Sequence, residues 1–227
     1  MQSINIIGGG MAGCEAAWQL VNSNIPVTIY EMRPKKRTFA HKTETLAELV
    51  CSNSFRSSDH ENNAVGLLHW EMKQANSLII NTAQTHSVPA GGALAVDREL
   101  FAEEITKTIQ NHPLITVVRD EISDLSIFKN AFIIIATGPL TSEKLIANLI
   151  KLTGYENLAF FDAIAPIVYA DSVDMTKAWF QSRYDKGKTK EERTAYLNCS
   201  LSKKEYYDFI DKLLYFRWGQ KSDPFWL

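Results

Sequence analysis

The feature that most constrains the fold is a glycine-rich turn near the start of the chain. A short apolar run, residues 4–7, leads into Gly8-Gly9-Gly10-Met11-Ala12-Gly13, and residues 13–21 are rich in helix formers. Residues 27–31 (VTIYE) then form a second run of β-branched and aromatic residues. Strand, glycine turn, helix and strand within about 30 residues make a βαβ unit. The sequence therefore predicts an α/β fold with a parallel sheet.

The glycines fit the G-x-G-x-x-G pattern of dinucleotide-binding turns in its proper context. Gly8 permits a sharp turn, Gly10 lets the backbone approach a diphosphate, and Gly13 lets the helix pack on the strand. The helix N-terminus that follows, with Gly9, Met11 and Ala12, offers N–H groups and a partial positive charge. We therefore predict a dinucleotide site here rather than a purely structural turn.

Glu31 ends the second strand of this unit and is expected to accept hydrogen bonds from ribose hydroxyls. A carboxylate there repels a 2′-phosphate, so NADP is not expected at this site. The glycine pattern does not choose between FAD and NAD. The apolar run at 131–136, closed by Thr137 and Gly138, favours FAD because many flavoproteins return such a strand beside the cofactor. A plain core strand with a turn is the alternative interpretation of that run.

Helices are also expected over residues 71–83, 97–110 and 141–152, and strands over 116–118 and 163–170. Ser202 and Glu205 have capping-box spacing before a further helix. The helix over 97–110 is expected to bury one apolar side, formed by Leu100, Phe101, Ile105 and Ile109.

Charge and cysteine content limit the possible partners. The formal net charge of -2 provides no attraction of the whole molecule to nucleic acid, so RNA binding would need a local patch. One basic cluster, formed by Arg33, Lys35, Lys36 and Arg37, is a candidate for tRNA phosphate, with a solvated loop as the alternative. Neither an N-terminal signal peptide nor a membrane-spanning run is evident. The three cysteines and five histidines show no metal-binding spacing, and a cytoplasmic location is expected.

Longer stretches resemble the bacterial folate- and FAD-dependent tRNA (uracil-5-)-methyltransferase family TrmFO, which is related to GidA. They are INIIGGGMAGCEAAWQL, PVTIYEMRP, AELVCSNSFRS, NAVGLLHWEM, VPAGGALAVDRE, ATGPLTS, FFDAIAPIV, SRYDKG and YLNC. The resemblance implies FAD as cofactor, reducing equivalents from NAD(P)H, and transfer of the methylene carbon of methylenetetrahydrofolate to a T-loop uridine of tRNA. It also implies a role for Cys51 in the methyl-transfer chemistry, whereas the residues alone favour an inert buried thiol. Cys14 is expected to be a packing residue, and Cys199 has no assigned role.

The resemblance implies an incomplete, FAD-binding Rossmann-like domain of the GidA type. Residues 1–165 are expected to be its N-terminal part, residues 166–215 the start of an inserted α/β domain, and residues 216–227 a tail unlike the family. Family members are expected to be about twice as long, which suggests a truncated chain and a separate C-terminal fragment as partner. Two functions therefore remain open: a tRNA methyltransferase, or a non-catalytic remnant that at most binds a nucleotide.

Overall fold

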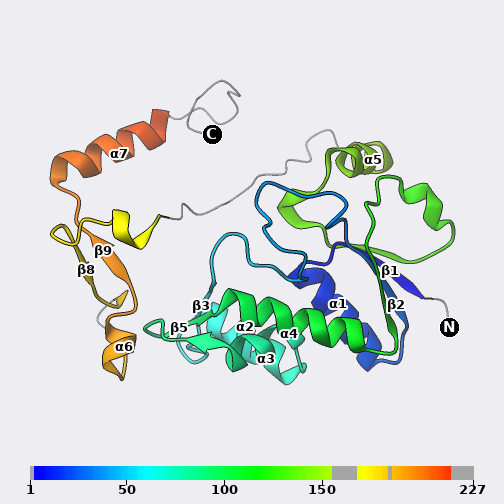
Figure 1. The fold of residues 1–227 in the computed structure, drawn as a ribbon, viewed down its shortest axis with the longest axis horizontal. Helices are drawn as coiled ribbons and strands as arrows, with labels where there is room; N and C mark the ends of the chain where they lie inside the picture. The colour runs from blue at the N-terminus through cyan, green and yellow to red at the C-terminus, as the bar shows by residue number, and fades with distance from the viewer. Residues whose placement is uncertain (1–2, 155–167, 184–185, 216–227) are drawn as a thin grey trace. The chain divides into compact units, whose positions relative to one another are not determined.

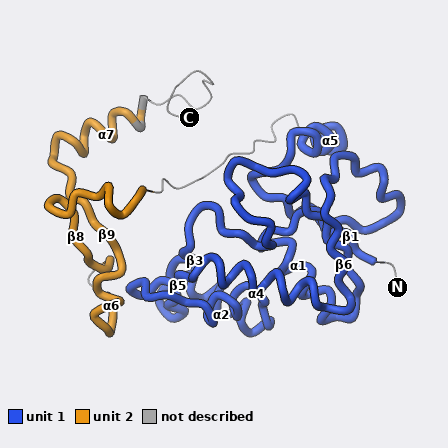
Figure 2. The backbone as a smooth tube through the Cα atoms, viewed as in Figure 1, with its two compact units in different colours: residues 1–167 blue, residues 168–227 orange. Residues whose placement is uncertain are grey.

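A computed structural model describes residues 3–154, 168–183 and 186–215 of the chain. The chain forms two compact units, residues 1–167 and residues 168–227 (Figure 2). The domain assignments expected from the sequence, residues 1–165, 166–215 and 216–227, stay predictions. Among the helices of the described residues, none has the length and apolar character that a membrane span requires.

The first unit is built on a parallel sheet of four strands in the order β6-β2-β1-β7 (Figure 1). The strands are β1 (Ile4–Ile7), β2 (Val27–Tyr30), β6 (Ile115–Val118) and β7 (Ile133–Ile135). β1 is central, since Ile6 is in register with Ile29 of β2 and with Ile134 of β7. The α/β class and the parallel sheet expected from the sequence are confirmed.

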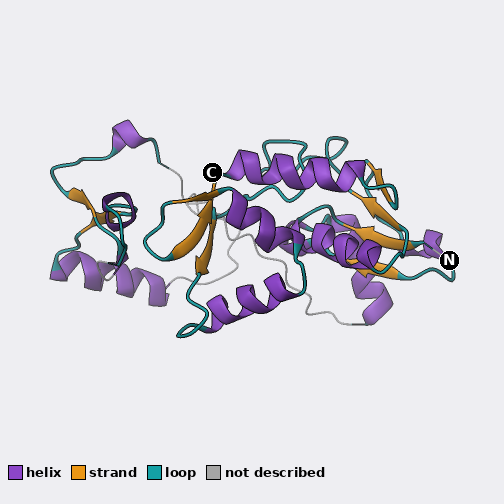
Figure 3. Cartoon of the chain, turned by 90° about the horizontal axis from the view of Figure 1, so that it is seen from below, coloured by secondary structure: helices purple, strands orange, loops and turns teal. Residues whose placement is uncertain are grey.

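Side chains on the two faces of this sheet enter two different cores, because successive residues of a strand point to opposite faces. Ile6 packs with buried residues of α1 (Met11–Asn22), α3 (Leu78–Thr85) and α4 (Arg98–Asn111). Ile7, its neighbour, packs in a smaller cluster with Leu145 of α5 (Glu143–Thr153) and Leu125 of η1 (Leu125–Phe128). Helices therefore flank the strands, as the turned view in Figure 3 shows.

A small antiparallel sheet, in the order β3-β5-β4, adjoins these helices within the first unit. Its strands are β3 (Ser54–Ser57), β4 (Ser87–Val88) and β5 (Ala93–Val96), none of which was expected from the sequence. The helix expected over 71–83 is instead two helices, α2 (Ala64–Gln74) and α3. The break occurs where Asn76 has a positive φ of 55° and the Ser77 side chain accepts a hydrogen bond from the N–H of Ile80 to cap α3.

The buried face of α4 consists of Phe101, Ala102, Ile105 and Ile109. Leu100 was expected on this face but is 49% exposed, so that expectation is wrong. Leu100 directly precedes Phe101, and consecutive residues of a helix lie about 100° apart around its axis. The start of α4 is fixed by Asp97, whose side chain accepts from the N–H groups of Glu99 and Leu100.

The second unit contains a two-stranded antiparallel sheet and short helices. Its elements are η3 (Ala170–Ser172), β8 (Ala178–Phe180), α6 (Lys190–Arg193), β9 (Leu197–Cys199) and α7 (Lys203–Tyr215). The capping box expected before α7 is present, because Ser202 and Glu205 exchange backbone-to-side-chain hydrogen bonds. The strand expected over 163–170 falls mostly outside the described residues, and Ala170 begins η3 instead.

Candidate functional site

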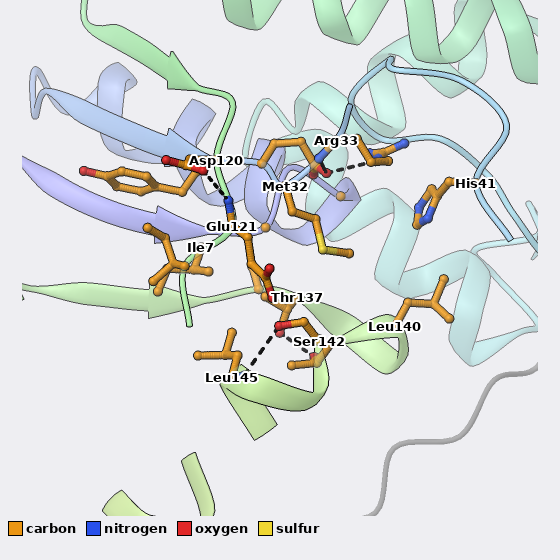
Figure 4. Close-up of a pocket in the computed structure, with 17 residues that line it drawn as sticks. Ile7, Met32, Arg33, His41, Asp120, Glu121, Thr137, Leu140, Ser142 and Leu145 are labelled. Atoms are coloured by element: carbon orange, nitrogen blue, oxygen red, sulfur yellow. Dashed lines mark hydrogen bonds and ion pairs between the residues drawn. The ribbon is translucent and has the colours of Figure 1, made fainter. Parts of the chain in front are cut away.

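A pocket lies at the carboxyl ends of the four parallel strands. Its lining includes Gly8 after β1, Glu31 after β2, Asp120 after β6 and Thr137 after β7. In chain order the strands of this sheet run third, second, first, fourth, so the order reverses between β1 and β7. Ligands of open α/β sheets bind outside the carboxyl ends of the strands at such a reversal. Figure 4 shows Arg33 and His41 on one side of the pocket, and Thr137, Ser142 and Leu145 on the other.

The three pattern glycines occupy the turn from β1 to α1, and each has a different environment. Gly8 has a φ of 107°, and an added Cβ would lie 2.6 Å from the carbonyl oxygen of Ala136. At Gly13 an added Cβ would lie 1.9 Å from the carbonyl oxygen of Gly8, so the helix start fits against the turn only without a side chain. At Gly10 nothing lies within 4 Å of an added Cβ. Two of these glycines therefore serve packing, while Gly10 borders open space.

The N-terminus of α1 is available to an anion. Gly10 is its N-cap, with no capping side chain, and its first turn contains no acidic residue. Met11 and Ala12 lie in this first turn and are exposed. Neither belongs to the pocket lining, which includes Gly8 and Gly10 but not Gly9 or Gly13. Binding roles for these six residues stay predictions.

Glu31 is buried, with 5% of its surface exposed, and both of its carboxylate oxygens are held. Oε2 accepts from the backbone N–H of Gly9 at 2.9 Å, and Oε1 accepts from Arg33 through its backbone N–H at 3.0 Å and its Nε at 2.9 Å. Burial by itself would raise the pKa of Glu31, but the Arg33 guanidinium and these N–H donors together hold that pKa below its usual range. Glu31 is therefore a carboxylate, held rigidly at the pocket wall.

The end of β7 contributes a hydroxyl pair to the opposite side. Thr137 lines the pocket, and its Oγ1 lies 2.6 Å from Oγ1 of Thr141, which donates to the carbonyl of Gly138 at 2.7 Å. Gly138 begins η2 (Gly138–Leu140) with a φ of 62° and is not part of the lining. Of this predicted pair only Thr137 lines the pocket, and a cofactor-binding role for either residue stays a prediction.

The three cysteines have different environments. Cys14 lies on the buried face of α1 and is fully buried, and burial raises the pKa of its thiol to about 12. Cys51 is partly buried and lies outside the pocket lining, with its carbonyl 3.4 Å from Nη2 of Arg98. Cys199 is exposed in the second unit. The expectation that Cys51 takes part in catalysis stays a prediction.

The basic cluster after β2 is paired with carboxylates. Arg33 is only 2% exposed, whereas the other three bases form surface ion pairs. These pairs are Lys35 with Asp120, Lys36 with Glu121 and Arg37 with Glu44, at 3.3, 2.7 and 3.3 Å. Because each cation has an acidic partner, this segment presents no excess positive charge for RNA phosphates.

Sequence reasoning missed several residues of the site. Met32, His41, Asp120 and Glu121 line the pocket, and Glu48 binds Arg33 beside it. Asp120 and Glu121 could have been found, since they follow an apolar strand at the sheet edge where ligands bind. Nothing in the local sequence marks Glu48. Within the described residues, no group of three or more His, Cys, Asp or Glu side chains could hold a metal ion.

Comparison with known proteins places the whole arrangement in a family. The family model described as glucose inhibited division protein A matches residues 3–215, which include both the glycine turn and Glu31. The chain belongs to this family. That membership accords with the parallel sheet and its glycine turn.

Individual relatives are named methylenetetrahydrofolate–tRNA-(uracil-5-)-methyltransferase TrmFO. The chain is 60% identical to that of Cereibacter sphaeroides and 61% identical to that of Dinoroseobacter shibae, over 213 residues and 94% of this chain in each case. It is 58% identical to that of Roseobacter denitrificans over 229 residues and 99% of this chain, so this match reaches into residues 216–227. The matches cover 48%, 47% and 50% of the three relatives, so the chain spans about half their length.

Proposed function

We propose that this chain binds the adenosine diphosphate part of FAD in the pocket of its first unit. One observation carries this proposal. The N-terminus of α1, which has no capping side chain, and the buried, ionised carboxylate of Glu31 lie at the carboxyl ends of the neighbouring strands β1 and β2. The first suits a diphosphate and the second suits ribose hydroxyls.

The residues present fit such a cofactor. Gly10 leaves open space where a diphosphate would approach the backbone, and Oε2 of Glu31, which accepts only from Gly9, keeps a lone pair for a further donor. Glu31 would accept from the ribose, α1 would bind the diphosphate, and Thr137 would border the path toward the flavin ring. Bound flavin would supply the redox chemistry of the reaction.

The larger proposal is that this chain takes part in folate-dependent methylation of tRNA uridine. Its support is the identity of about 60% to proteins whose name describes that reaction. Methylenetetrahydrofolate and tRNA would be the substrates, with NAD(P)H as reductant. Residues 1–165 would then belong to the FAD-binding domain and residues 166–215 to an inserted domain.

A second candidate function is nucleotide binding without methyl transfer. The position of Cys51 favours it, since this thiol is not among the residues that line the pocket. The two functions share the same nucleotide site and differ in turnover.

Calorimetric titration of the 227-residue chain with ADP and with FAD tests the site. Both ligands are expected to bind, and Gly10→Ala is expected to weaken binding at least about tenfold, or ~1.4 kcal/mol, because the new methyl group occupies the approach of the diphosphate. The backbone of Gly10, with φ of −74°, accepts alanine, so thermal stability stays unchanged. Gly154→Asn, at the left-handed C-cap of α5 where asparagine is tolerated and outside the pocket lining, is the control and should leave binding unaffected. Failure of both ligands to bind would refute the proposal.

Incubation of the FAD-loaded chain with tRNA lacking the T-loop methyl group, methylenetetrahydrofolate and NAD(P)H separates the two functions. Formation of 5-methyluridine would establish methyl transfer. FAD binding without product would support the nucleotide-binding function for this chain.

A further inference from the structure

A closed ring of contacts connects Glu31, Arg33, Glu48 and the glycine turn. Arg33 donates to Glu31 through Nε and to Glu48 Oε2 through Nη1, both at 2.9 Å. Glu31 accepts from the N–H of Gly9, and the carbonyl of Gly9 accepts from the N–H of Ala47 at 2.9 Å. Ala47 directly precedes Glu48 in the chain, which closes the ring.

Glu48 organises residues 42–48 around its carboxylate. Oε1 accepts from the N–H of Lys42 at 2.8 Å, while Oε2 accepts from the N–H and the hydroxyl of Thr43 at 3.2 and 2.9 Å. Leu46, in the same stretch, is fully buried, and its Cδ2 lies 2.5 Å from where a Cβ on Gly9 would be. This stretch therefore rests directly on the glycine turn.

Stability alone does not account for a buried guanidinium between two carboxylates. Taking these charges out of water costs free energy, and well-packed apolar residues often replace such groups without loss of stability. The planar guanidinium fixes the direction of each carboxylate it binds, which a point charge does not. Arg33 therefore sets the orientation of both Glu31 and Glu48.

We propose that Arg33 and Glu48 are positioning residues that couple nucleotide occupancy at Glu31 to the placement of residues 42–51, the segment that ends at Cys51. This coupling rests on the proposed nucleotide site. A ribose hydroxyl that donates to Glu31 shares this carboxylate with Arg33, and Arg33 transmits the change to Glu48. Coupling between two positions is reciprocal, so placement of residues 42–51 also affects nucleotide affinity.

Thiol labelling of Cys51 in the Cys199→Ser background measures the placement of this segment. Cys199 lies in the second unit outside the ring, and buried Cys14 reports on the integrity of the fold. Glu48→Gln puts an amide NH₂ or a single carbonyl oxygen where the backbone donors and Arg33 need two acceptors. Without nucleotide, this variant is expected to label at Cys51 about tenfold faster, equivalent to ~1.4 kcal/mol, with Cys14 still protected. Glu44→Gln, which alters an exposed ion pair of the same segment, is the matched control and should change the rate less than about twofold.

The effect of ADP on the rate of Cys51 labelling distinguishes coupling from a purely structural role of Glu48, since a structural role predicts no loss of the ADP response. In the parent chain, ADP is expected to slow Cys51 labelling by about threefold or more, and in Glu48→Gln this response is lost although ADP still binds. Should Glu48→Gln expose Cys14 and so fail to fold, Glu48→Asp, which keeps the charge but shortens the side chain, is expected to show the same loss.

Unchanged Cys51 rates in both Glu48 variants would overturn the coupling, as would an ADP response equal to that of the parent chain. Absence of ADP binding in the parent chain would refute the proposed function instead. The nucleotide-free labelling rates of the Glu48 variants would still decide whether Glu48 positions residues 42–51.

Discussion

The two units differ in what they bury. The first unit encloses apolar cores on both faces of its parallel sheet, and within it Arg33 and Glu31 are only 2% and 5% exposed. In the second unit, among the residues whose burial is described, only Ala178 and Ser182 are buried. Large apolar side chains of that unit, such as Phe180 and Phe209, are more than half exposed.

The two units therefore differ in where they can hold a functional charge in a fixed orientation. A carboxylate is oriented firmly when it is removed from water and held by several donors, which requires an apolar surrounding. Glu31 has this surrounding. Asp174 in the second unit has hydrogen bonds from Thr176 but is exposed to solvent, and water competes for them. The structure thus favours the first unit as the place for ligand chemistry.

The largest contrast is expected from adding one methyl group to a glycine of each unit. Gly13→Ala places a Cβ 1.9 Å from a backbone oxygen between helix and strand, and more than about 4 kcal/mol of unfolding free energy should be lost. Gly187 has a φ of 141°, and an added Cβ would lie 2.8 Å from Cβ of Glu192, so Gly187→Ala is expected to cost about 1–3 kcal/mol. Urea unfolding followed by circular dichroism measures both. Equal losses would show that the second unit is as rigid as the first.

Removal of a buried cation is expected to cost more stability than removal of an exposed one. Arg33→Met removes the cation that neutralises the carboxylates of Glu31 and Glu48, at a cost of about 3–5 kcal/mol in the free energy of unfolding. Lys177→Met removes an ion pair with Asp174 whose side chains are 82% and 53% exposed, and the expected change is about 0–1 kcal/mol. Thermal unfolding of the two variants checks the order. A small effect at Arg33 would contradict its assignment as a buried bridge.

Truncation of an aromatic ring compares the apolar packing of the units. Phe101 is fully buried against Phe55, with ring centroids 5.5 Å apart, and Phe101→Ala is expected to cost about 3–5 kcal/mol. Phe209 on α7 is 53% exposed, and Phe209→Ala should change stability by less than about 1 kcal/mol. Denaturant midpoints report both values. A cost at Phe209 near that of Phe101 would contradict the exposure of the Phe209 ring.

The smallest contrast is expected in the response to acid. The pKa of Glu31 is lowered in the folded chain, so its contribution is present above the unfolded-state pKa of about 4.3 and is lost as the pH falls through the lower folded-state value. Glu31→Gln should therefore flatten the decline of stability below about pH 4.3. Asp174→Asn should leave it almost unchanged, because solvent screens this exposed group. Urea titrations between about pH 3 and pH 6 measure these slopes. Parallel curves for Glu31→Gln and the parent chain would contradict the role of Arg33.

The sequence by itself predicted the elements that are specified by residues close together in the chain. The apolar run before Gly8, the helix after it and the strand ending at Glu31 lie close together in the chain, so their pattern predicted β1, α1 and β2. The capping box of α7 was likewise predicted, because Ser202 and Glu205 are three residues apart. Such elements are specified by periodicity, caps and turn residues, all of which act over one or two turns of chain.

Tertiary structure alone decided which side chains meet across long separations. Burial of Arg33 depends on Glu48, fifteen residues away, and on the stretch that Leu46 anchors against Gly9. The basic cluster of the sequence therefore consists of one buried arginine, which binds two carboxylates, and three bases in surface ion pairs. The physical reason is that the sequence shows which charges exist, whereas their partners and their exposure to water are fixed only when the sheet, its helices and the connecting segments pack together.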